Sequence, residues 1–336
     1  MIAELQLTHP EKPQLALQNG AGYLFCDDTG EQFPIVNGIP RMVRQIDDGQ
    51  TQTMDGFSYK WERTPNFGKT QEHQRVFLQA YREWFGINTT DDFAKYMKDK
   101  VVLNAGCGCG RNEHFWGKFP KRIIDLDISR AIDVAKRNWS HDSRFSFVQG
   151  DVLKLPFASN TFDVVWSEGV LHHTPSTYEA LRSCVRVLKP DGVILFYVYR
   201  KKAPLREFAD DHIRNAIADL PPDKAWAALE PLTHLAKAFS DLKARVTIPT
   251  DVDLLGFKAG TFDVQRFMYY NVMKFYWNDE FTFDENVHIN FDWYYPKYCW
   301  RHTVDEIRGW LRDFGLTELE MHEADSGIGV VARKGA

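Results

Sequence analysis

At 336 residues, with 44% hydrophobic and 26% charged side chains, the chain has an ordinary globular composition and room for one large domain or two modest ones. The formal net charge of −5 argues against a broad basic surface for nucleic acid, and no apolar run approaches the ~18 residues of a membrane-spanning helix. The N-terminal residues show no secretory signal and the five cysteines are scattered, so we expect free thiols in a cytoplasmic protein.

Residues 1–50 contain short strand-like pieces separated by turn signals such as Asn19-Gly20. Within this stretch, residues 23–26 and 33–40 look like the second half of a small zinc-ribbon-like module. A tetrahedral zinc site takes about four Cys or His ligands, whereas Cys26 is the one cysteine here. We therefore expect a module over residues 1–50 that holds no metal and serves for docking or packing.

A helix and then a run of alternating elements follow. Residues 70–86 carry apolar side chains at helical spacing, and Gly86 ends the helix. Between residues 101 and 200, helical segments alternate with five short apolar ones, which read VVLNAG, RIIDLDIS, FSFVQGD, FDVVWSEG and GVILFYVY. Strands that are buried on both faces and joined by helices predict a parallel sheet. The predicted fold class is therefore α/β, with a Rossmann-like, doubly wound, mostly parallel sheet.

Beyond these strands the chain leaves the predicted sheet and then returns to close it. Residues 204–245 read as helices interrupted at Pro221-Pro222, and 16 of the 51 residues from 250 to 300 are aromatic. Residues 303–306 form a capping box for a helix, and residues 317–324 and 327–334 read as a hairpin that predicts an antiparallel last strand. We expect a core of residues 51–200 and 301–336, interrupted by a substrate cap or dimerisation insertion over residues 201–300.

Glycines and acids follow the predicted strands at their carboxyl ends, where such sheets bind ligands. Gly106, Gly108 and Gly110 come directly after the first strand and allow a ligand to lie against the backbone; the alternative is a tight packing turn. Their G-x-G-x-G spacing differs from the G-x-G-x-x-G of dinucleotide sites. Asp127 at the second strand can accept both ribose hydroxyls of a nucleoside, or else act as a helix N-terminal acid. Asp151 after the third strand can accept from an adenine amine.

Four segments, VLNAGCGCGR, DLDIS, GDVLKLPFASNTFDVVWSEGVLHH and VLKPDGVILF, together resemble the class I S-adenosylmethionine-dependent methyltransferases of bacterial small-molecule type. The resemblance covers roughly residues 55–200 and 301–336. It implies methyl transfer as the activity and S-adenosyl-L-methionine as the cofactor. By this resemblance the cofactor-binding residues are Gly106, Cys107, Gly108, Gly110, Arg111, Asp127, Ile128, Asp151, Val152, Ser167 and Gln71. Asn104 and Cys109 depart from the family's usual aspartate and its threonine or serine, and we expect Asn104 to weaken cofactor affinity because it lacks the negative charge.

The residues that act on the methyl acceptor are less clearly marked. His172 and His173 follow the fourth strand, where an imidazole can serve as a general base, although paired histidines also occur there in the family without that role. The aromatic segment would cover the acceptor as a pocket or form a dimer contact. Candidates for acceptor binding are Tyr59, Trp61, Asp284, Glu285, His288, Asp292, Tyr294 and Tyr295. The basic residues Arg200, Lys201, Lys202 and Arg206 would bind an anionic part of the acceptor or lie in a solvated loop.

The leading hypothesis is methyl transfer to oxygen or nitrogen of a small organic acceptor by in-line displacement, with no metal, no nucleic-acid partner and no membrane insertion. A homodimer through the aromatic insertion is a further hypothesis. An RNA or protein methyltransferase is suggested by the N-terminal module but disfavoured by the acidic charge and the absence of an N-P-P-Y-type motif. Asn104 alone favours a non-catalytic S-adenosylmethionine-binding module. The glycine spacing and the terminal hairpin disfavour a nicotinamide dehydrogenase.

Overall fold

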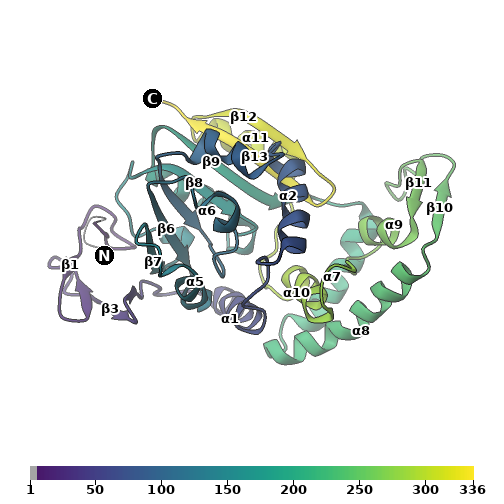
Figure 1. The fold of residues 1–336 in the computed structure, drawn as a ribbon, viewed down its shortest axis with the longest axis horizontal. Helices are drawn as coiled ribbons and strands as arrows, with labels where there is room; N and C mark the ends of the chain where they lie inside the picture. Colours follow the sequence, from purple (N-terminus) through teal and green to yellow (C-terminus); the bar gives the residue numbers. More distant parts are fainter. Residues whose placement is uncertain (1–5) are drawn as a thin grey trace.

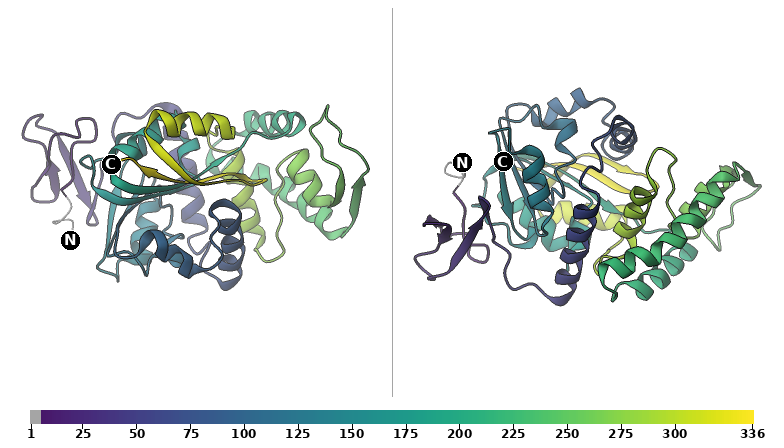
Figure 2. Two further views of the ribbon diagram at one scale, coloured as in Figure 1. Left: turned by 90° about the horizontal axis from the view of Figure 1, so that it is seen from above. Right: turned by 60° about the horizontal axis from the view of Figure 1, so that its bottom comes forward.

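The computed structural model describes residues 6–336. A small N-terminal sheet, a large central sheet with flanking helices, and a helical extension follow one another along its longest axis (Figure 1). Figure 2 shows from two further sides that the small sheet and the helical extension lie at opposite ends of the central sheet. No helix among the described residues is long and apolar enough to cross a membrane.

The N-terminal module is a four-stranded antiparallel sheet in the order β1-β2-β3-β4. Its strands are β1 (Gln18–Asn19), β2 (Tyr23–Phe25), β3 (Gln32–Val36) and β4 (Ile39–Pro40). Arg41 joins the module to the core, since its guanidinium lies 2.6 Å from the Asp133 carboxylate and donates to Gln149 Oε1 at 3.2 Å. Cys26 is fully buried, and within residues 6–336 no group of three or more His, Cys, Asp or Glu side chains is placed to hold a metal ion.

The central sheet has seven strands in the order β12-β13-β9-β8-β5-β6-β7. They are β5 (Val101–Ala105), β6 (Arg122–Asp127), β7 (Phe145–Gln149), β8 (Phe162–Glu168), β9 (Leu188–Tyr199), β12 (Leu316–Glu323) and β13 (Gly327–Lys334). Strands β5 to β9 pair in parallel, whereas β13 pairs antiparallel with both β9 and β12. The predicted Rossmann-like α/β fold and its antiparallel closing hairpin are therefore confirmed.

Helices cover both faces of the central sheet (Figure 1). The α-helices of this core are α1 (Asp48–Arg63), α2 (Gln71–Phe85), α3 (Ala94–Met97), α4 (Glu113–Trp116), α5 (Ala131–Trp139), α6 (Thr177–Val187) and α11 (Val304–Asp313), and short 3₁₀ turns cover Thr90–Phe93, Val152–Lys154 and Leu171–His173. Helix α2 ends at Gly86, which adopts a left-handed conformation, and α11 begins at the capping box of Thr303 and Glu306, as the sequence predicts. Helix α1 was not predicted.

The helical extension consists of α7 (Pro204–Ile217), α8 (Pro222–Asp241), β10 (Arg245–Ile248), β11 (Gly260–Asp263), α9 (Val264–Asn271) and α10 (Phe283–Tyr294). The predicted interruption at Pro221-Pro222 separates α7 from α8. Strands β10 and β11 form a two-stranded antiparallel sheet. Helix α10 packs against both α8 and α1, so the extension returns to the core before the chain enters α11.

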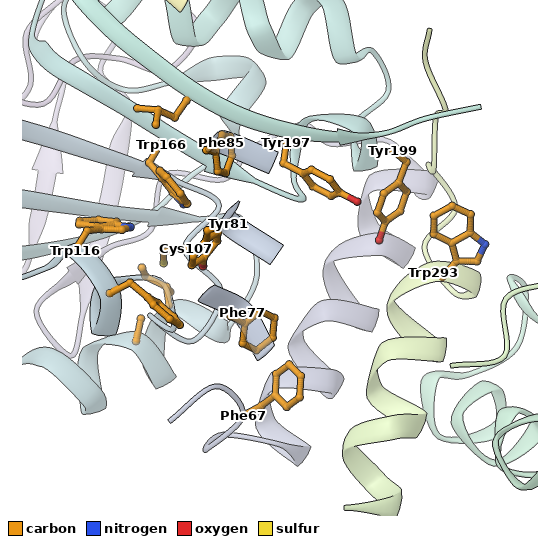
Figure 3. Packing of buried hydrophobic residues seen from close by; sticks show 14 of the residues in the cluster. Phe67, Phe77, Tyr81, Phe85, Cys107, Trp116, Trp166, Tyr197, Tyr199 and Trp293 are labelled. Carbon is orange, nitrogen blue, oxygen red and sulfur yellow. The ribbon is translucent and has the colours of Figure 1, made fainter. Parts of the chain in front are cut away.

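Aromatic side chains connect the core to the helical extension (Figure 3). On β9, Tyr197 stacks on Trp84 of α2 with 4.0 Å between ring centroids. The ring centroid of Tyr199, two residues further along the same strand, lies 4.3 Å from that of Trp293 in α10. Because close packing of this kind leaves little freedom to slide, α10 is held in a defined position at the end of the sheet.

Strand β13 passes so close to α2 at Gly329 that a Cβ there would overlap the backbone oxygen of Trp84. We expect Gly329→Ala to lower the free energy of unfolding by about 3 kcal/mol, because a helix backbone cannot move aside as a side chain can. Gly309→Ala in α11 is the matched control, since its Cβ would meet no atom closer than 4.0 Å. We expect that change to raise the free energy of unfolding by about 0.5–1 kcal/mol. Urea unfolding followed by circular dichroism measures both, and equal effects would contradict the tight contact.

Candidate active site

A cavity of about 480 Å³ lies beyond the carboxyl ends of β5, β6, β7 and β8. The strand order reverses beside β5, and open α/β sheets bind ligands at such a point. The strand ends form one side of the cavity wall, and α1, α2 and the helical extension form the other. The predicted site residues that the structure brings to this wall are Gly106, Cys107, Gly108, Arg111, Asp127, Ile128, Asp151, Val152, His173, Trp61, His288 and Asp292.

The bend after β5 exposes backbone to the cavity at Gly106 and Gly108. Their φ angles are +87° and +56°, in the left-handed region that favours glycine. A Cβ at position 106 would overlap Val170, and one at position 108 would lie 2.9 Å from Trp61 of α1. Any other residue at these two positions would therefore collide with Val170 or Trp61, so the bend requires glycine at both.

Asp127 ties the glycine bend to the end of β6. One carboxylate oxygen accepts from the Gly108 amide at 2.8 Å, and the other accepts from the Ser129 amide at 2.8 Å and hydroxyl at 2.6 Å. Burial raises the pKa of this carboxyl group, and the hydrogen bonds from Ser129 and Gly108 oppose the rise. Since a carboxylate has about four acceptor sites, one remains for a ligand hydroxyl while these bonds persist. Acceptance from both ribose hydroxyls would require the Ser129 hydroxyl to turn away.

Asp151 lies after β7 and also has protein partners. Its carboxylate accepts from the Leu153 amide at 2.9 Å and from the Gln50 side-chain amide at 3.0 Å. Gln50 and Thr53 of α1 belong to the same part of the wall. Helix α1 thus closes the side of the cavity that faces the ends of β6 and β7, and sequence analysis missed both of its polar residues there.

Three residues predicted for the cofactor do not line the cavity. Gly110 packs against α5, where a Cβ would lie 2.7 Å from Trp139. Ser167 is fully buried behind the wall and donates to the Ala105 carbonyl at 2.9 Å. Gln71 is exposed at the start of α2, whereas the wall residues of that helix begin at Val76, more than one turn further along. The resemblance placed Gln71 by its position in the chain, but the direction of α2 turns it outward.

The predicted acceptor-binding residues are also divided. Asp284, Glu285, Tyr59, Tyr294 and Tyr295 lie outside the cavity wall. The Tyr294 hydroxyl lies 2.8 Å from Asp210 and 2.7 Å from the Lys274 carbonyl oxygen, and the Tyr295 hydroxyl donates to the Leu220 carbonyl at 2.9 Å. These rings therefore hold the helical extension together. His288 and Asp292 reach the wall because they lie one helical turn apart on the inner face of α10.

Asp292 is the centre of a polar cluster at the far end of the cavity. Lys60 of α1 forms a buried ion pair with its Oδ1 atom, and the Tyr199 hydroxyl donates to Oδ2 at 2.9 Å. Burial acts to raise the pKa of Asp292, but the ammonium groups of Lys60 and Lys274 hold it well below its usual range. The carboxylate is therefore ionised, and it joins α1, β9 and α10 across the cavity.

A second ion pair lines the wall between the glycine bend and α2. Arg111 Nη2 donates to Glu168 Oε1 at 2.6 Å, and the Tyr81 hydroxyl donates to Glu168 Oε2 at 2.9 Å. The Arg111 guanidinium lies 3.9 Å from the ring centroid of Phe77. This pair leaves a charged but locally balanced surface between the two ends of the cavity.

His173 is the better placed of the two predicted histidines. Its Nδ1 atom lies 2.7 Å from the Tyr298 carbonyl oxygen, and its Nε2 atom has no hydrogen-bond partner within residues 6–336. Because a carbonyl can only accept, the proton sits on Nδ1 and Nε2 is left with a lone pair. Burial lowers the pKa of His173 to about 4, so the ring is neutral at pH 7. His172 is fully buried behind the wall, with its ring 3.9 Å from that of Tyr199, and does not reach the cavity.

Asn104 lies behind the glycine bend, fully buried and off the cavity wall. Its side-chain amide donates to Glu113, which faces Asp125 of β6 in the same buried pocket. Burial, and then the charge of Glu113, raise the pKa of Asp125 well above its ordinary range, so this acid pair retains a proton. Any effect of Asn104 on cofactor affinity therefore has to act through the core, and the expected weakening stays a prediction.

Comparison with known proteins assigns the class of this domain. Residues 103–196, from β5 to β9, match the family described as "Methyltransferase domain". Together with the observed sheet order, this match shows that the chain carries a class I S-adenosylmethionine-dependent methyltransferase domain. The cofactor of that class is S-adenosyl-L-methionine.

Individual relatives are more distant. The chain is 28% identical to phosphoethanolamine N-methyltransferase 1 of Arabidopsis thaliana over 47% of its own length and 33% of that protein's. It is 34% identical to the malonyl-[acyl-carrier protein] O-methyltransferase of Enterobacter lignolyticus over 28% of its own length and 37% of that protein's. The chain thus spans about a third of each of these relatives. Among solved structures, the N-methyltransferase NodS of Bradyrhizobium japonicum with bound S-adenosyl-L-homocysteine is similar at 14% identity and a TM-score of 0.42, over 83% of this chain and 99% of that one.

Proposed function

We propose that this protein transfers a methyl group from S-adenosylmethionine to an oxygen or nitrogen atom of a small organic acceptor. The observation that carries the proposal is the division of one cavity into two unlike ends. The glycine bend, Asp127 and Asp151 line one end, which suits an adenosyl group because it offers open backbone and carboxylate acceptors. His173, Asp292 and aromatic rings of the extension line the other, which suits an organic acceptor.

The cofactor supplies a methyl group already activated by its sulfonium, so that the acceptor's lone pair bonds to the methyl carbon while the carbon–sulfur electron pair stays on sulfur. Gly106 and Gly108 would hold it against the backbone, and Asp127 would accept from its ribose. The protein then has to align the acceptor with the methyl group, which can contribute up to about 7–11 kcal/mol. His173 Nε2 is the group that would take a proton from an acceptor that arrives protonated.

The aromatic segment between residues 250 and 300 supports the role of a cap. Tyr269, Tyr270 and Tyr276 lie on the cavity wall, whereas Phe291 and Trp293 are buried in the packing of α10. A covered acceptor end excludes water from the reacting atoms. We therefore propose residues 201–300 as a substrate cap on a core of residues 51–200 and 301–336, with residues 1–50 as a docking module.

Calorimetric titration with S-adenosylmethionine, S-adenosylhomocysteine and NAD tests the cofactor. We expect saturable binding of the first two at one site for each chain, and no heat from NAD, because the G-x-G-x-G spacing differs from the G-x-G-x-x-G of dinucleotide sites. Binding of NAD without S-adenosylhomocysteine would contradict the proposal. Mass spectrometry of a defined panel of small alcohols, amines, carboxylic acids and phosphoethanolamine, each incubated with S-adenosylmethionine, then tests for a gain of one methyl group.

A further inference from the structure

Lys274 places a buried ammonium at the acceptor end of the cavity. The residue follows α9, lines the cavity and is 6% exposed. Its backbone is held firmly, since its amide donates to Asp210 at 2.9 Å and its carbonyl lies 2.7 Å from the Tyr294 hydroxyl. Its ammonium lies 4.7 Å from the ring centroid of Trp293 and 5.9 Å from that of Tyr199, and it has neither an ion pair nor a hydrogen-bond acceptor among the described residues.

The acids of the cavity are already occupied by other partners. Asp292 is the acid whose charge raises the pKa of Lys274 most, but its oxygens already accept hydrogen bonds from Lys60 and Tyr199. Glu168 serves Arg111 and Tyr81 at the other side of the wall. Glu83 is exposed at the rim. The Lys274 ammonium therefore has no carboxylate partner of its own among residues 6–336.

Arg266 of α9 is a second cation in the cavity that lacks a carboxylate partner. It lines the same cavity, and its guanidinium lies 5.5 Å from the Tyr276 ring centroid and 5.7 Å from that of Tyr269. No carboxylate within residues 6–336 pairs with its side chain. Asp292 is the acid that the helical extension contributes to the wall, and it already pairs with Lys60, so neither cation has a carboxylate partner among residues 6–336.

The basic residues that the sequence suggested for an anion are used elsewhere. Lys202 donates to the Ser326 carbonyl at 2.9 Å, and Arg206 forms a buried pair with Asp210 at 2.5 Å. Neither residue lines the cavity. Lys274 and Arg266 are therefore the cations available to a ligand in the cavity.

A buried ammonium without an acceptor is costly to the folded chain. Burial lowers the pKa of Lys274 to about 8, although the nearby Asp292 opposes the decrease. The group is still mostly charged at pH 7, and its hydrogen-bond donors are unmet. A ligand oxyanion would remove this cost, because charge-assisted hydrogen bonds are about twice as strong as neutral ones.

We propose that the methyl acceptor is an anionic small molecule whose carboxylate or phosphate oxygens bind Lys274, with Arg266 as a second donor. The proposal rests on the proposed function, because it names the substrate class for the same cavity. Anchored at Lys274, the acceptor would extend past Asp292 toward His173 and the glycine bend, all of which line the same continuous cavity.

The test titrates inorganic phosphate and, separately, acetate into the protein loaded with S-adenosylhomocysteine, at constant ionic strength and pH 7, by calorimetry. We expect saturable binding of at least one anion. The anion that binds more tightly indicates whether the natural group is a phosphate or a carboxylate. Lys274→Met should weaken it at least 10-fold and Lys274→Arg should largely restore it, since the charge returns. Lys258→Met is the matched control, because Lys258 is an exposed lysine that pairs with Asp251 at 2.7 Å outside the cavity.

Absence of saturable anion binding in the loaded wild type, or equal affinity in Lys274→Met, would overturn the proposal. Arg266→Gln is the second variant, since Arg266 is only partly buried and pairs with no carboxylate among residues 6–336. If Lys274→Met does not fold, unchanged anion affinity in Arg266→Gln would overturn the two-donor site and a decrease would support it. Loading with S-adenosylhomocysteine distinguishes a failure of the proposed function from a failure of this inference. If the protein does not bind S-adenosylhomocysteine, the proposed function is contradicted. If it binds S-adenosylhomocysteine but no anion, this inference alone is contradicted.

Discussion

Asp127→Ala is expected to weaken the binding of S-adenosylhomocysteine by at least about 100-fold. The carboxylate holds the glycine bend through the Gly108 amide at 2.8 Å and has one acceptor site left for a ribose hydroxyl. Hydrogen bonds to a charged group contribute about 1.5–3 kcal/mol each, so losing both the anchor and the ligand contact accounts for this decrease. Calorimetric titration measures the dissociation constant directly.

Two further variants distinguish the loss of the ribose contact at Asp127 from a loss of local structure. Asp127→Asn keeps the shape of the side chain but places a donor or an uncharged oxygen opposite Gly108, so we expect an intermediate loss. Asp133→Asn removes an acid from neighbouring α5 that pairs with Arg41 and does not line the cavity, and it should leave the affinity unchanged. Wild-type affinity in Asp127→Ala, in a protein with a normal circular dichroism spectrum, would mean that Asp127 only organises the bend.

His173→Gln is expected to lower the turnover number by about 10²–10⁴-fold while leaving the affinity for S-adenosylhomocysteine unchanged, if the acceptor found in the panel arrives protonated. The reason is that His173 lines the cavity and its Nε2 atom has no hydrogen-bond partner within residues 6–336, whereas its Nδ1 atom is held by the Tyr298 carbonyl. Turnover should be measured as methyl incorporation at saturating acceptor, so that the effect on rate is separated from the effect on the Michaelis constant.

The pH dependence of the methyl-transfer rate follows from the lowered pKa of His173. Burial reduces this pKa to about 4, below the ordinary 6.5, so the base is present above that value and is lost as the pH falls through it. The rate should therefore show no loss from this group between pH 8 and about 5.

His302→Gln is the matched control for His173→Gln. Burial also lowers the pKa of His302 to about 4, but His302 does not line the cavity. Equal losses in both variants would indicate a structural role for His173.

The fold could be predicted because its signals are local. The five parallel strands of the central sheet contain short apolar segments, and helix ends such as those at Gly86 and Thr303 carry their own glycine or capping residue. Such patterns depend on neighbours within a few residues of the chain. The same holds for the adenosyl end of the cavity, where the candidate residues come directly after strands whose carboxyl ends must meet at one edge of a parallel sheet.

The acceptor end depends on contacts between distant parts of the chain. Lys60 and Asp292 are 232 residues apart in the sequence, and Tyr199 and Asp292 are 93 apart. The sequence singled out Tyr59 and Trp61 but neither Lys60 between them nor Lys274, because a lysine on a helix or in a loop is usually a solvated residue. Their burial is decided by the return of α10 to α1. The direction of α2 in turn excludes Gln71, and packing within the extension accounts for Tyr294 and Tyr295.

The amino-acid sequence by itself determined the α/β fold, the reversed closing strand and the position of the glycine bend with its two acids, since periodicity and turn chemistry act over short stretches of chain. Only the tertiary structure decided which charges share the cavity, that Asp127 uses most of its hydrogen-bond acceptor sites within the protein, and that the Lys274 ammonium has no partner among residues 6–336. Pairing and burial are properties of surfaces brought together in space, and a one-dimensional pattern does not encode which surfaces meet.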